Sequence, residues 1–216
     1  MGWVTTPSWD SAYAGSVPPP WDVGEPQPAF VRLAERGLLT GQVLDAGCGT
    51  GEQTLLAASS GADALGVDVS PLAVEQARGK AAARGIPAAA GGQIGSARCE
   101  VADALGLADL GLGFDTIIDS GLFHVFDDES RGRYVTSLAS VLRPGGRLYL
   151  MCFSDRQPGM FGPRRVGQDE LRAAFSDGWT IIEIQADTFA INREAFGTAT
   201  AQAWLATISR DELLPR

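Results

Sequence analysis

The sequence is poor in lysine, histidine and cysteine, and each shortage narrows the possible functions. Only one lysine, Lys80, and one histidine, His124, occur in 216 residues. The three widely spaced cysteines form neither a metal-binding signature nor a disulfide framework, so no metal is expected and reduced thiols in the cytoplasm are predicted. No apolar run reaches the 18 residues that suggest a membrane span, and residues 1–10 lack the features of a secretory signal.

Positive charge is also scarce. The formal net charge is −9 at pH 7, whereas proteins that hold nucleic acid usually present a basic face. Nucleic acid and membranes are therefore not expected as partners. Hydrophobic residues make up 45% of the chain and charged residues 20%, which is typical of a globular domain with a sizeable core. We expect one such domain, as a monomer or a homodimer.

Residues 1–28 differ in composition from the rest of the chain. They are rich in Trp, Pro and Gly, with three consecutive prolines at residues 18–20. They also carry aromatic residues, which disordered tails usually lack. We therefore predict an N-terminal arm over residues 1–28 that packs over the active site as a lid, followed by one domain over residues 29–216.

The domain alternates short apolar runs with helical periodicity, which predicts an α/β fold: a Rossmann-like, seven-stranded, mostly parallel sheet with helices on both faces. No clear helix separates the last two strands, so the last strand is expected to be antiparallel. Loops are expected at residues 88–97 and 188–200. The predicted strands are residues 42–45, 64–68, 98–102, 114–119, 147–154, 179–187 and 201–209. The predicted helices are residues 30–38, 50–59, 71–84, 127–142 and 168–175.

The most informative segment, residues 43–52, joins an apolar run to three glycines at alternate positions, Gly47, Gly49 and Gly51. We interpret the run as a buried strand and the glycines as the tight turn after it. Thr50 is expected to open a helix whose free N–H groups point back at a ligand that lies against the glycine backbone. This segment predicts a nucleotide-type binding site.

The residues around the turn select among nucleotides. A dinucleotide site has Gly-x-Gly-x-x-Gly and a phosphate-binding loop has Gly-Lys-Ser/Thr, and neither pattern is present. Asp45 and Glu52 flank the turn, where they would serve a pyrophosphate poorly but suit a cationic ligand that bears hydroxyls. A nicotinamide-dependent reductase stays open as an alternative.

At this point the sequence resembles the class I S-adenosylmethionine-dependent methyltransferases. Residues 43–51 match the first motif of that family almost residue for residue, and four further motifs follow in order at residues 65–70, 101–104, 114–119 and 142–148. Five motifs in register across residues 30–210 argue against a chance match. The resemblance implies S-adenosylmethionine as the cofactor and S-adenosylhomocysteine as its product.

The resemblance also implies roles for residues at the carboxyl ends of the strands, where open α/β sheets bind ligands. Asp45 would engage the methionine ammonium, directly or through water. Asp68 would accept both ribose hydroxyls, and Asp103 the adenine amino group. Cys48 is expected to be a small buried residue of the turn and not a nucleophile. The predicted cofactor-binding residues are Trp21, Gly24, Asp45, Gly47, Gly49, Gly51, Asp68, Val69, Asp103, Ala104, Asp119 and Ser120.

The segment that follows the fourth strand faces the acceptor in such enzymes. It holds His124 between Phe123 and Phe126. His124 is the predicted catalytic residue, either as a base or as an orienting donor, and a histidine that only hydrogen-bonds the loop is the alternative. Amino methyltransferases of nucleobases and glutamine have Asn/Asp-Pro-Pro-Tyr/Phe here, which this chain lacks.

The arm resembles the leader of thiopurine, thiol and halide methyltransferases and of related bacterial enzymes that detoxify heterocycles. The resemblance rests on Trp9-Asp10, Tyr13 and residues 19–24. In such enzymes the leader folds over the cofactor and helps to close the acceptor pocket. Residues 187–198, with Phe189 and Phe196, would complete the lid around a flat, apolar acceptor. The predicted acceptor-binding residues are Trp9, Tyr13, Phe123, Phe126, Arg164 and Arg165.

The resemblance therefore implies an enzyme that transfers the methyl group of S-adenosylmethionine to an O, S or N atom of a small aromatic or heterocyclic molecule, in detoxification or secondary metabolism. A thiol or halide methyltransferase is the first alternative. A non-catalytic S-adenosylmethionine-binding regulatory module is the second, and the acids Asp45, Asp68 and Asp103 argue against it.

Overall fold

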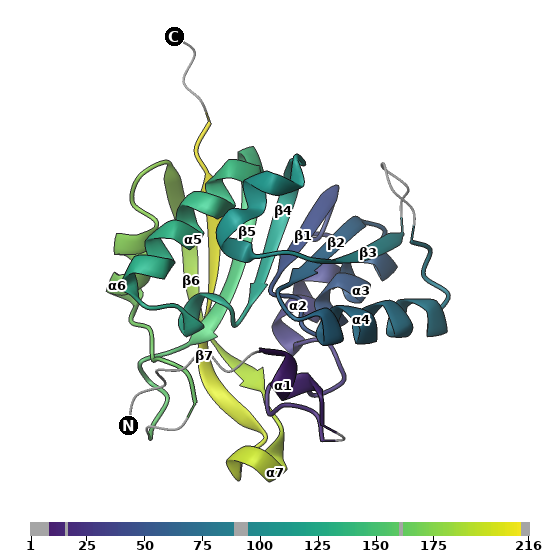
Figure 1. The fold of residues 1–216 in the computed structure, drawn as a ribbon. Coiled ribbons are helices and arrows are strands. Elements are labelled where there is room, and N and C mark those ends of the chain that lie inside the picture. The colour runs from purple at the N-terminus through teal and green to yellow at the C-terminus, as the bar shows by residue number, and fades with distance from the viewer. Residues whose placement is uncertain (1–8, 16, 89–94, 160–161, 213–216) are drawn as a thin grey trace.

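A single sheet of seven strands organises the protein (Figure 1). The computed structural model describes residues 9–15, 17–88, 95–159 and 162–212. The strands are β1 (Gln42–Ala46), β2 (Asp63–Asp68), β3 (Ser96–Val101), β4 (Phe114–Ser120), β5 (Leu142–Phe153), β6 (Trp179–Ala190) and β7 (Thr200–Arg210). They lie in the order β3-β2-β1-β4-β5-β7-β6, and only β7 runs antiparallel to its neighbours. The predicted Rossmann-like sheet is confirmed.

Helices cover both faces of the sheet. One face carries α2 (Pro28–Glu35), α3 (Glu52–Ser59) and α4 (Pro71–Ala83), and the other carries η1 (Ala104–Leu110), α5 (Asp128–Val141) and α6 (Gln168–Ala174). Three further helices are short: α1 (Trp9–Tyr13), η2 (Phe123–Val125) and α7 (Arg193–Phe196). Among the described helices, none is long and apolar enough to cross a membrane.

Successive residues of the central strands contribute their side chains to two separate hydrophobic cores, one on each face of the sheet. Ile117 packs with α5 and α6, whereas Ile118 packs with α2 and α3. The same alternation separates Leu150 from Met151 in β5. Because successive side chains of a strand point to opposite faces, an uninterrupted apolar run is what a sheet buried on both sides requires.

The largest differences between the predicted and the observed element boundaries are four. Helix α3 begins at Glu52 rather than Thr50, because Gly51 has a φ of 87° and lies outside the helix. Strand β5 begins at Leu142 rather than at residue 147, and residues 144–146 form an irregularity inside it, where the register with β4 shifts. Strand β6 continues to Ala190, and α7 forms in the predicted loop. Strand β3 begins at Ser96, and residues 89–94 of the other predicted loop lie outside the described residues.

The described part of the arm packs against the carboxyl ends of the parallel strands. In Figure 1, α1 lies beside this edge of the sheet, next to α4. The Asp10 carboxylate accepts a hydrogen bond from Ser70 Oγ, and Thr50 Oγ1 donates to Asp22 Oδ2 at 2.7 Å. Gln27 attaches the end of the arm to β6, because its side-chain amide donates a hydrogen bond to Ala190 O and accepts one from Ala190 N. The arm is thereby tied to the start of α4, to the glycine turn before α3 and to β6.

Candidate active site

The glycine turn and Asp68 form one hydrogen-bonded unit. Gly47, Gly49 and Gly51 all have positive φ, a conformation that side-chain-bearing residues rarely adopt. Gly49 N donates to Asp68 Oδ2 at 2.9 Å, and Ser70 N donates to Oδ1 at 2.9 Å. Burial raises the pKa of Asp68 above its usual value. The carboxylate is therefore held at the end of β2, facing the turn.

Asp45 lies beneath the same turn with an unsatisfied oxygen. It is 1% exposed, and its Oδ2 accepts a hydrogen bond of 2.7 Å from Thr54 Oγ1. Among the described residues, Oδ1 has no hydrogen-bond partner. Burial raises the pKa of Asp45 to about 7. A buried carboxylate oxygen without a donor favours a cationic group nearby, as the ammonium of S-adenosylmethionine would provide.

The aromatic residues of the arm rest on the glycine turn. Tyr13 is buried, and its hydroxyl accepts a hydrogen bond of 3.1 Å from Trp21 Nε1. A Cβ atom added at Gly49 would lie only 3.1 Å from that hydroxyl oxygen. Trp21 is 47% exposed, and its ring centroid lies 6.0 Å from that of Trp9 in an edge-to-face arrangement. Three arm residues that the sequence predicted for the site are thus brought together beside the turn.

The other predicted cofactor residues also lie along this edge. Val69, which follows Asp68, is 50% exposed. Asp103 is exposed and its Oδ1 accepts a hydrogen bond of 2.9 Å from Leu105 N, so it caps η1. Ala104 is buried behind it, and Ser120 is half-buried at the end of β4. Val69 and Asp103 leave an open surface at the ends of β2 and β3.

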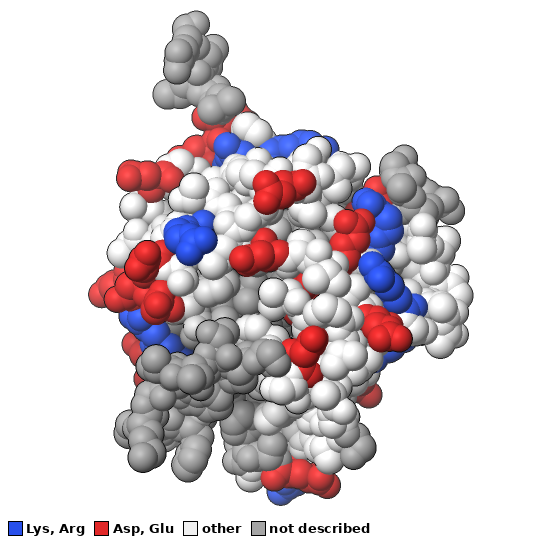
Figure 2. Space-filling model, in the orientation of Figure 1, with Lys and Arg blue, Asp and Glu red and all other residues white. Residues whose placement is uncertain are grey.

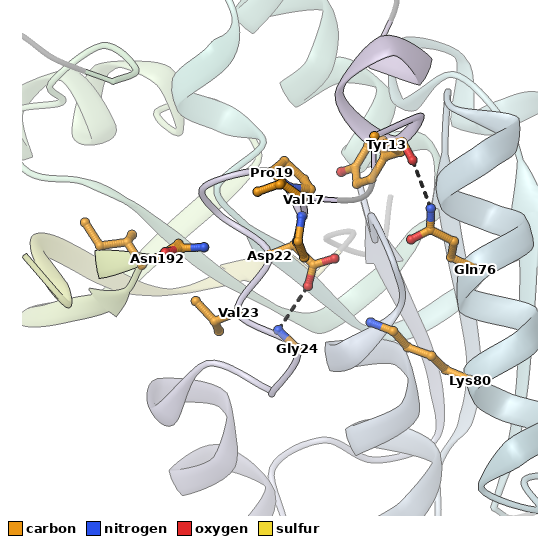
Figure 3. A pocket seen from close by; sticks show the side chains of 12 residues that line it. Tyr13, Val17, Pro19, Asp22, Val23, Gly24, Gln76, Lys80 and Asn192 are labelled. Atoms are coloured by element: carbon orange, nitrogen blue, oxygen red, sulfur yellow. Dashed lines mark hydrogen bonds between the residues drawn. The ribbon is translucent and has the colours of Figure 1, made fainter. Parts of the chain in front are cut away.

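An open cavity of about 610 Å³ lies on the other side of the arm, between the arm and α4. In Figure 3, Gln76 and Lys80 project from α4, and Asn192 lies across from them. Among the predicted site residues, only Tyr13 and Gly24 line it. Lys80 Nζ is engaged there by Glu52 Oε1 at 2.8 Å and by Thr50 Oγ1 at 2.6 Å. None of the three glycines of the turn lines this cavity, but two of its lining residues, Asp22 and Lys80, bond to Thr50 within the turn.

His124 is enclosed by aromatic rings. It is 6% exposed, and its ring lies 5.1 Å from Phe153 and 5.9 Å from Phe189, centroid to centroid. Its Nδ1 accepts a hydrogen bond of 3.0 Å from Phe153 N. Burial, followed by the positive charges of Arg165 and Arg131, lowers the pKa of His124 to about 3. The His124 imidazole is therefore neutral. We call His124, Phe153 and Phe189 the aromatic cluster.

Asp119 and Phe123 have structural contacts that the sequence did not predict. Asp119 is fully buried and accepts hydrogen bonds from Leu122 N at 2.7 Å, Phe123 N at 3.1 Å and Tyr134 Oη at 3.0 Å. Burial raises the pKa of Asp119 to about 7. Its oxygens hold the turn after β4. Phe123 is fully buried and stacks on Phe175 at 5.8 Å, so it belongs to the core and not to an acceptor pocket.

Phe126 and Arg164 also lie away from the aromatic cluster. Phe126 is half-buried and its ring packs 4.9 Å from that of Tyr134. Arg164 is exposed and pairs with Asp128 at 2.5 Å and with Glu170. These contacts place Phe126 against the core and Arg164 in a surface ion-pair network.

Arg165, in contrast, reaches the aromatic cluster. Its Cζ atom lies 5.3 Å from the centroid of Phe153. Its Nη1 donates to Pro163 O at 2.6 Å, and burial lowers the pKa of its guanidinium. Arg164 and Arg165 are adjacent in the sequence but have different surroundings in the structure, and no sequence pattern distinguished their positions.

The sequence reasoning missed Phe153 and Thr54. Phe153 is the last residue of β5, and its position at a carboxyl strand end was a usable signal. Thr54 lies in the first turn of α3 and reaches back to Asp45, a contact that depends on the shape of the glycine turn. Cys48 is buried as predicted, and a hydrogen bond with Cys99 together with burial raises the pKa of its thiol. The side chain of Phe196 lies outside the described residues.

Comparison with known proteins agrees with this geometry. The family model for thiopurine S-methyltransferase matches residues 4–210. A 2-heptyl-1-hydroxyquinolin-4(1H)-one methyltransferase of Mycobacteroides abscessus is 35% identical over 90% of this chain and 86% of its own length. A probable thiol methyltransferase 2 of Arabidopsis thaliana is 31% identical over 70% of this chain and 61% of its own length.

A solved structure is similar over almost the whole chain. It was reported for the conversion of a disulfide bond into a thioacetal group during echinomycin biosynthesis, and it superposes with a TM-score of 0.81 and 38% identity. The similarity covers 94% of this chain and 91% of that one. Together with the glycine turn and its acids, these matches make the protein a methyltransferase that uses S-adenosylmethionine. The chain belongs to the thiopurine S-methyltransferase family.

Proposed function

We propose that the acceptor of this methyltransferase is a small, planar heterocycle that carries the reacting O, S or N atom. The observation that carries this proposal is the aromatic cluster, which lies beyond the end of β4 and next to Gly121. Flat rings favour the stacked or edge-on packing that Phe153 and Phe189 offer. The Mycobacteroides relative named for a hydroxyquinolone supports the same class of acceptor.

The cofactor site proposed from the sequence agrees with the geometry for most of its residues. S-adenosylmethionine supplies an electrophilic methyl group on a sulfonium. Asp45 Oδ1 would receive the ammonium, and Asp68 the ribose hydroxyls. The exposed Val69 and Asp103 would bind the adenine, and the glycine turn would lie under the methionine and ribose. Trp21 would cover the cofactor from the arm, in keeping with its exposed ring.

The protein's own contribution to the reaction is alignment and exclusion of water. Methyl transfer from a sulfonium is an in-line displacement, so the enzyme must hold the acceptor atom against the methyl carbon. The aromatic cluster would orient the ring, and the arm would seal the site as a lid. Arg165 would hold an anionic oxygen or sulfur of the acceptor near Phe153.

A thiol methyltransferase is the second candidate, because the Arabidopsis relative is named as one. We further propose a cytoplasmic monomer or homodimer that does not bind nucleic acid. The three cysteines are free and buried, which suits a reducing compartment. On the face that Figure 2 shows, the described basic side chains are interspersed with acidic ones and form no extended patch.

A panel of acceptors tests the proposal. The purified protein is incubated with S-adenosylmethionine and, separately, with hydroxylated heterocycles, heteroaromatic thiols, small aliphatic thiols and iodide, and S-adenosylhomocysteine is quantified. We expect the highest kcat/KM with the heteroaromatic acceptors. Preference for aliphatic thiols or iodide would support the second candidate and contradict the first.

A further inference from the structure

We propose that the acceptor reacts as an anion formed before it binds, and that His124 stabilises this anion by donating a hydrogen bond from Nε2. The proposal rests on the proposed function, since it specifies which heterocycles that site takes. It replaces the general base that the single histidine suggested. The substrate class is then heteroaromatic thiols and acidic hydroxyls, as in N-hydroxy heterocycles, and not simple alcohols.

The first observation is the tautomer that the backbone imposes on His124. Phe153 N donates to Nδ1 at 3.0 Å, so Nδ1 must present its lone pair to the backbone. A neutral imidazole then carries its hydrogen on Nε2. Its only basic lone pair faces Phe153 N inside the protein, where an acceptor molecule cannot deliver a proton. His124 is therefore a donor at Nε2.

The second observation is the electrostatic setting of the imidazole. The charged side chains that act on it are Arg165, from the segment before α6, and Arg131 of α5, and both disfavour the imidazolium. The ring is also walled by Phe153 and Phe189. Burial and two cations together keep His124 neutral across the physiological range while they favour a negative charge beside it.

The third observation is that the carboxyl groups of the two central strands, Asp119 of β4 and Asp45 of β1, cannot serve instead. Asp119 is fully buried, and its oxygens accept three hydrogen bonds. Asp45 is 1% exposed and lies beneath the glycine turn, bonded to Thr54. A general base must reach the proton that it removes, directly or through one water. Neither group has that access.

The surroundings of Nε2 leave room for an acceptor atom. Gly121 borders Nε2: a Cβ atom built there would lie 3.4 Å from Nε2 and 3.5 Å from Phe189 Cζ, so a side chain at this position would fill the space beside the ring. Gly121 also has a φ of 93°, which favours glycine on backbone grounds. The Phe153 and Phe189 rings exclude water, which raises the reactivity of an anion that arrives without its proton.

The chemical step balances without a proton transfer. The acceptor loses its proton to solvent before binding. In the site, its anionic O or S forms a bond to the methyl carbon while the methyl–sulfur bond breaks, and the electron pair of that bond stays on sulfur. The negative charge of the acceptor and the positive charge of the sulfonium disappear together. The products are the neutral methyl ether or thioether and neutral S-adenosylhomocysteine sulfur.

A series of 4-substituted thiophenols tests the proposal on the unaltered protein. Their acidities span a wide range at nearly constant shape, and kcat/KM for each thiol is measured against pH with S-adenosylmethionine saturating at every pH, so that protonation of Asp45 does not limit the rate. We expect the midpoint of the acid limb to move with the pKa of each thiol. A limb that stays at one pH for all thiols would show an enzymatic base and would overturn the proposal. If none of these acceptors is methylated, the proposed function itself fails, which is a different outcome.

Two variants at His124 provide the second readout. His124→Gln retains an N–H donor at about the position of Nε2, and His124→Phe removes it. We expect His124→Phe to lower kcat/KM by about 10- to 100-fold without moving the acid limb, and His124→Gln to lose less. Loss of the pH dependence in His124→Phe would contradict the proposal. The thiophenol series decides the question even if a variant fails to fold.

Discussion

Replacing Thr54 by Val removes the side-chain hydroxyl that donates a hydrogen bond to the Asp45 carboxylate. The 2.7 Å bond joins a fully buried hydroxyl to a carboxylate that is 1% exposed. A hydrogen bond to a charged group contributes about 1.5–3 kcal/mol, so the free energy of unfolding should fall by that amount at pH 8.5. For a domain of this size the melting temperature should fall by about 3–10 °C.

The loss should depend on pH in a defined direction. Burial has raised the pKa of Asp45 to about 7, and the bond from Thr54 lowers it. The variant therefore binds its proton more tightly than the unaltered protein, so the destabilisation grows as pH rises through the pKa of Asp45. At pH 5.5, where Asp45 is largely protonated, we expect only about 0.5–1.5 kcal/mol, the contribution of a neutral hydrogen bond.

Thr54→Ser is the matched control, because it keeps the hydroxyl and removes only a buried methyl group. It should cost about 0.5–1.5 kcal/mol at both pH values. Urea denaturation followed by circular dichroism measures both variants at pH 5.5 and 8.5. Equal losses for Thr54→Val at the two pH values, or a Val variant as stable as the Ser variant, would refute the reasoning.

Further predictions follow from the same site. Affinity for S-adenosylmethionine, measured by calorimetry, should fall as pH is lowered from 8 to 6, because protonation of Asp45 removes the partner of the ammonium. The Asp45→Asn variant should bind the cofactor more weakly and with less pH dependence, and a pH curve of unchanged shape in this variant would contradict the assignment. Arg164→Ala should leave the KM for the acceptor within about twofold, because Arg164 pairs with surface carboxylates, whereas Arg165→Ala should raise that KM about tenfold. Steady-state kinetics that reverse this order would show that Arg164, and not Arg165, contacts the acceptor. Gly121→Ala should lower kcat/KM, because the added Cβ would lie 3.3 Å from the His124 imidazole, and should cost about 1–3 kcal/mol of stability, because residue 121 has a positive φ. Unchanged kinetics would show that the acceptor does not bind beside Gly121.

The sequence predicted the sheet and the cofactor edge because those features depend on local rules. Apolar runs, alternating glycines and an acid at each strand end have one sterically sensible arrangement in a parallel sheet. Asp45, Asp68 and the glycine turn lie where that rule places them. The Pro71 start of α4 was equally readable, because Ser70 caps the helix through Ala73 N.

Side-chain direction after β4 was not predictable in the same way. Asp119 ends a strand just as Asp68 does, but its carboxylate turns inward to bind Leu122 N and Phe123 N. That choice depends on the tight turn before η2 and on Tyr134, which comes from another element. The surroundings of Phe123 and Arg164 were unpredictable for the same reason, since contacts with α5 and α6 decide them.

The most direct test of the central claim is the stoichiometry of methyl transfer with a heteroaromatic thiol. The protein is incubated with S-adenosylmethionine and the thiol, and the methyl thioether and S-adenosylhomocysteine are quantified together. The account predicts equal amounts of both products, and a loss of at least about tenfold in kcat/KM for S-adenosylmethionine in Asp68→Ala, which removes the carboxylate proposed to bind the ribose hydroxyls. Absence of the thioether, or an Asp68→Ala variant as active as the unaltered protein, would contradict it.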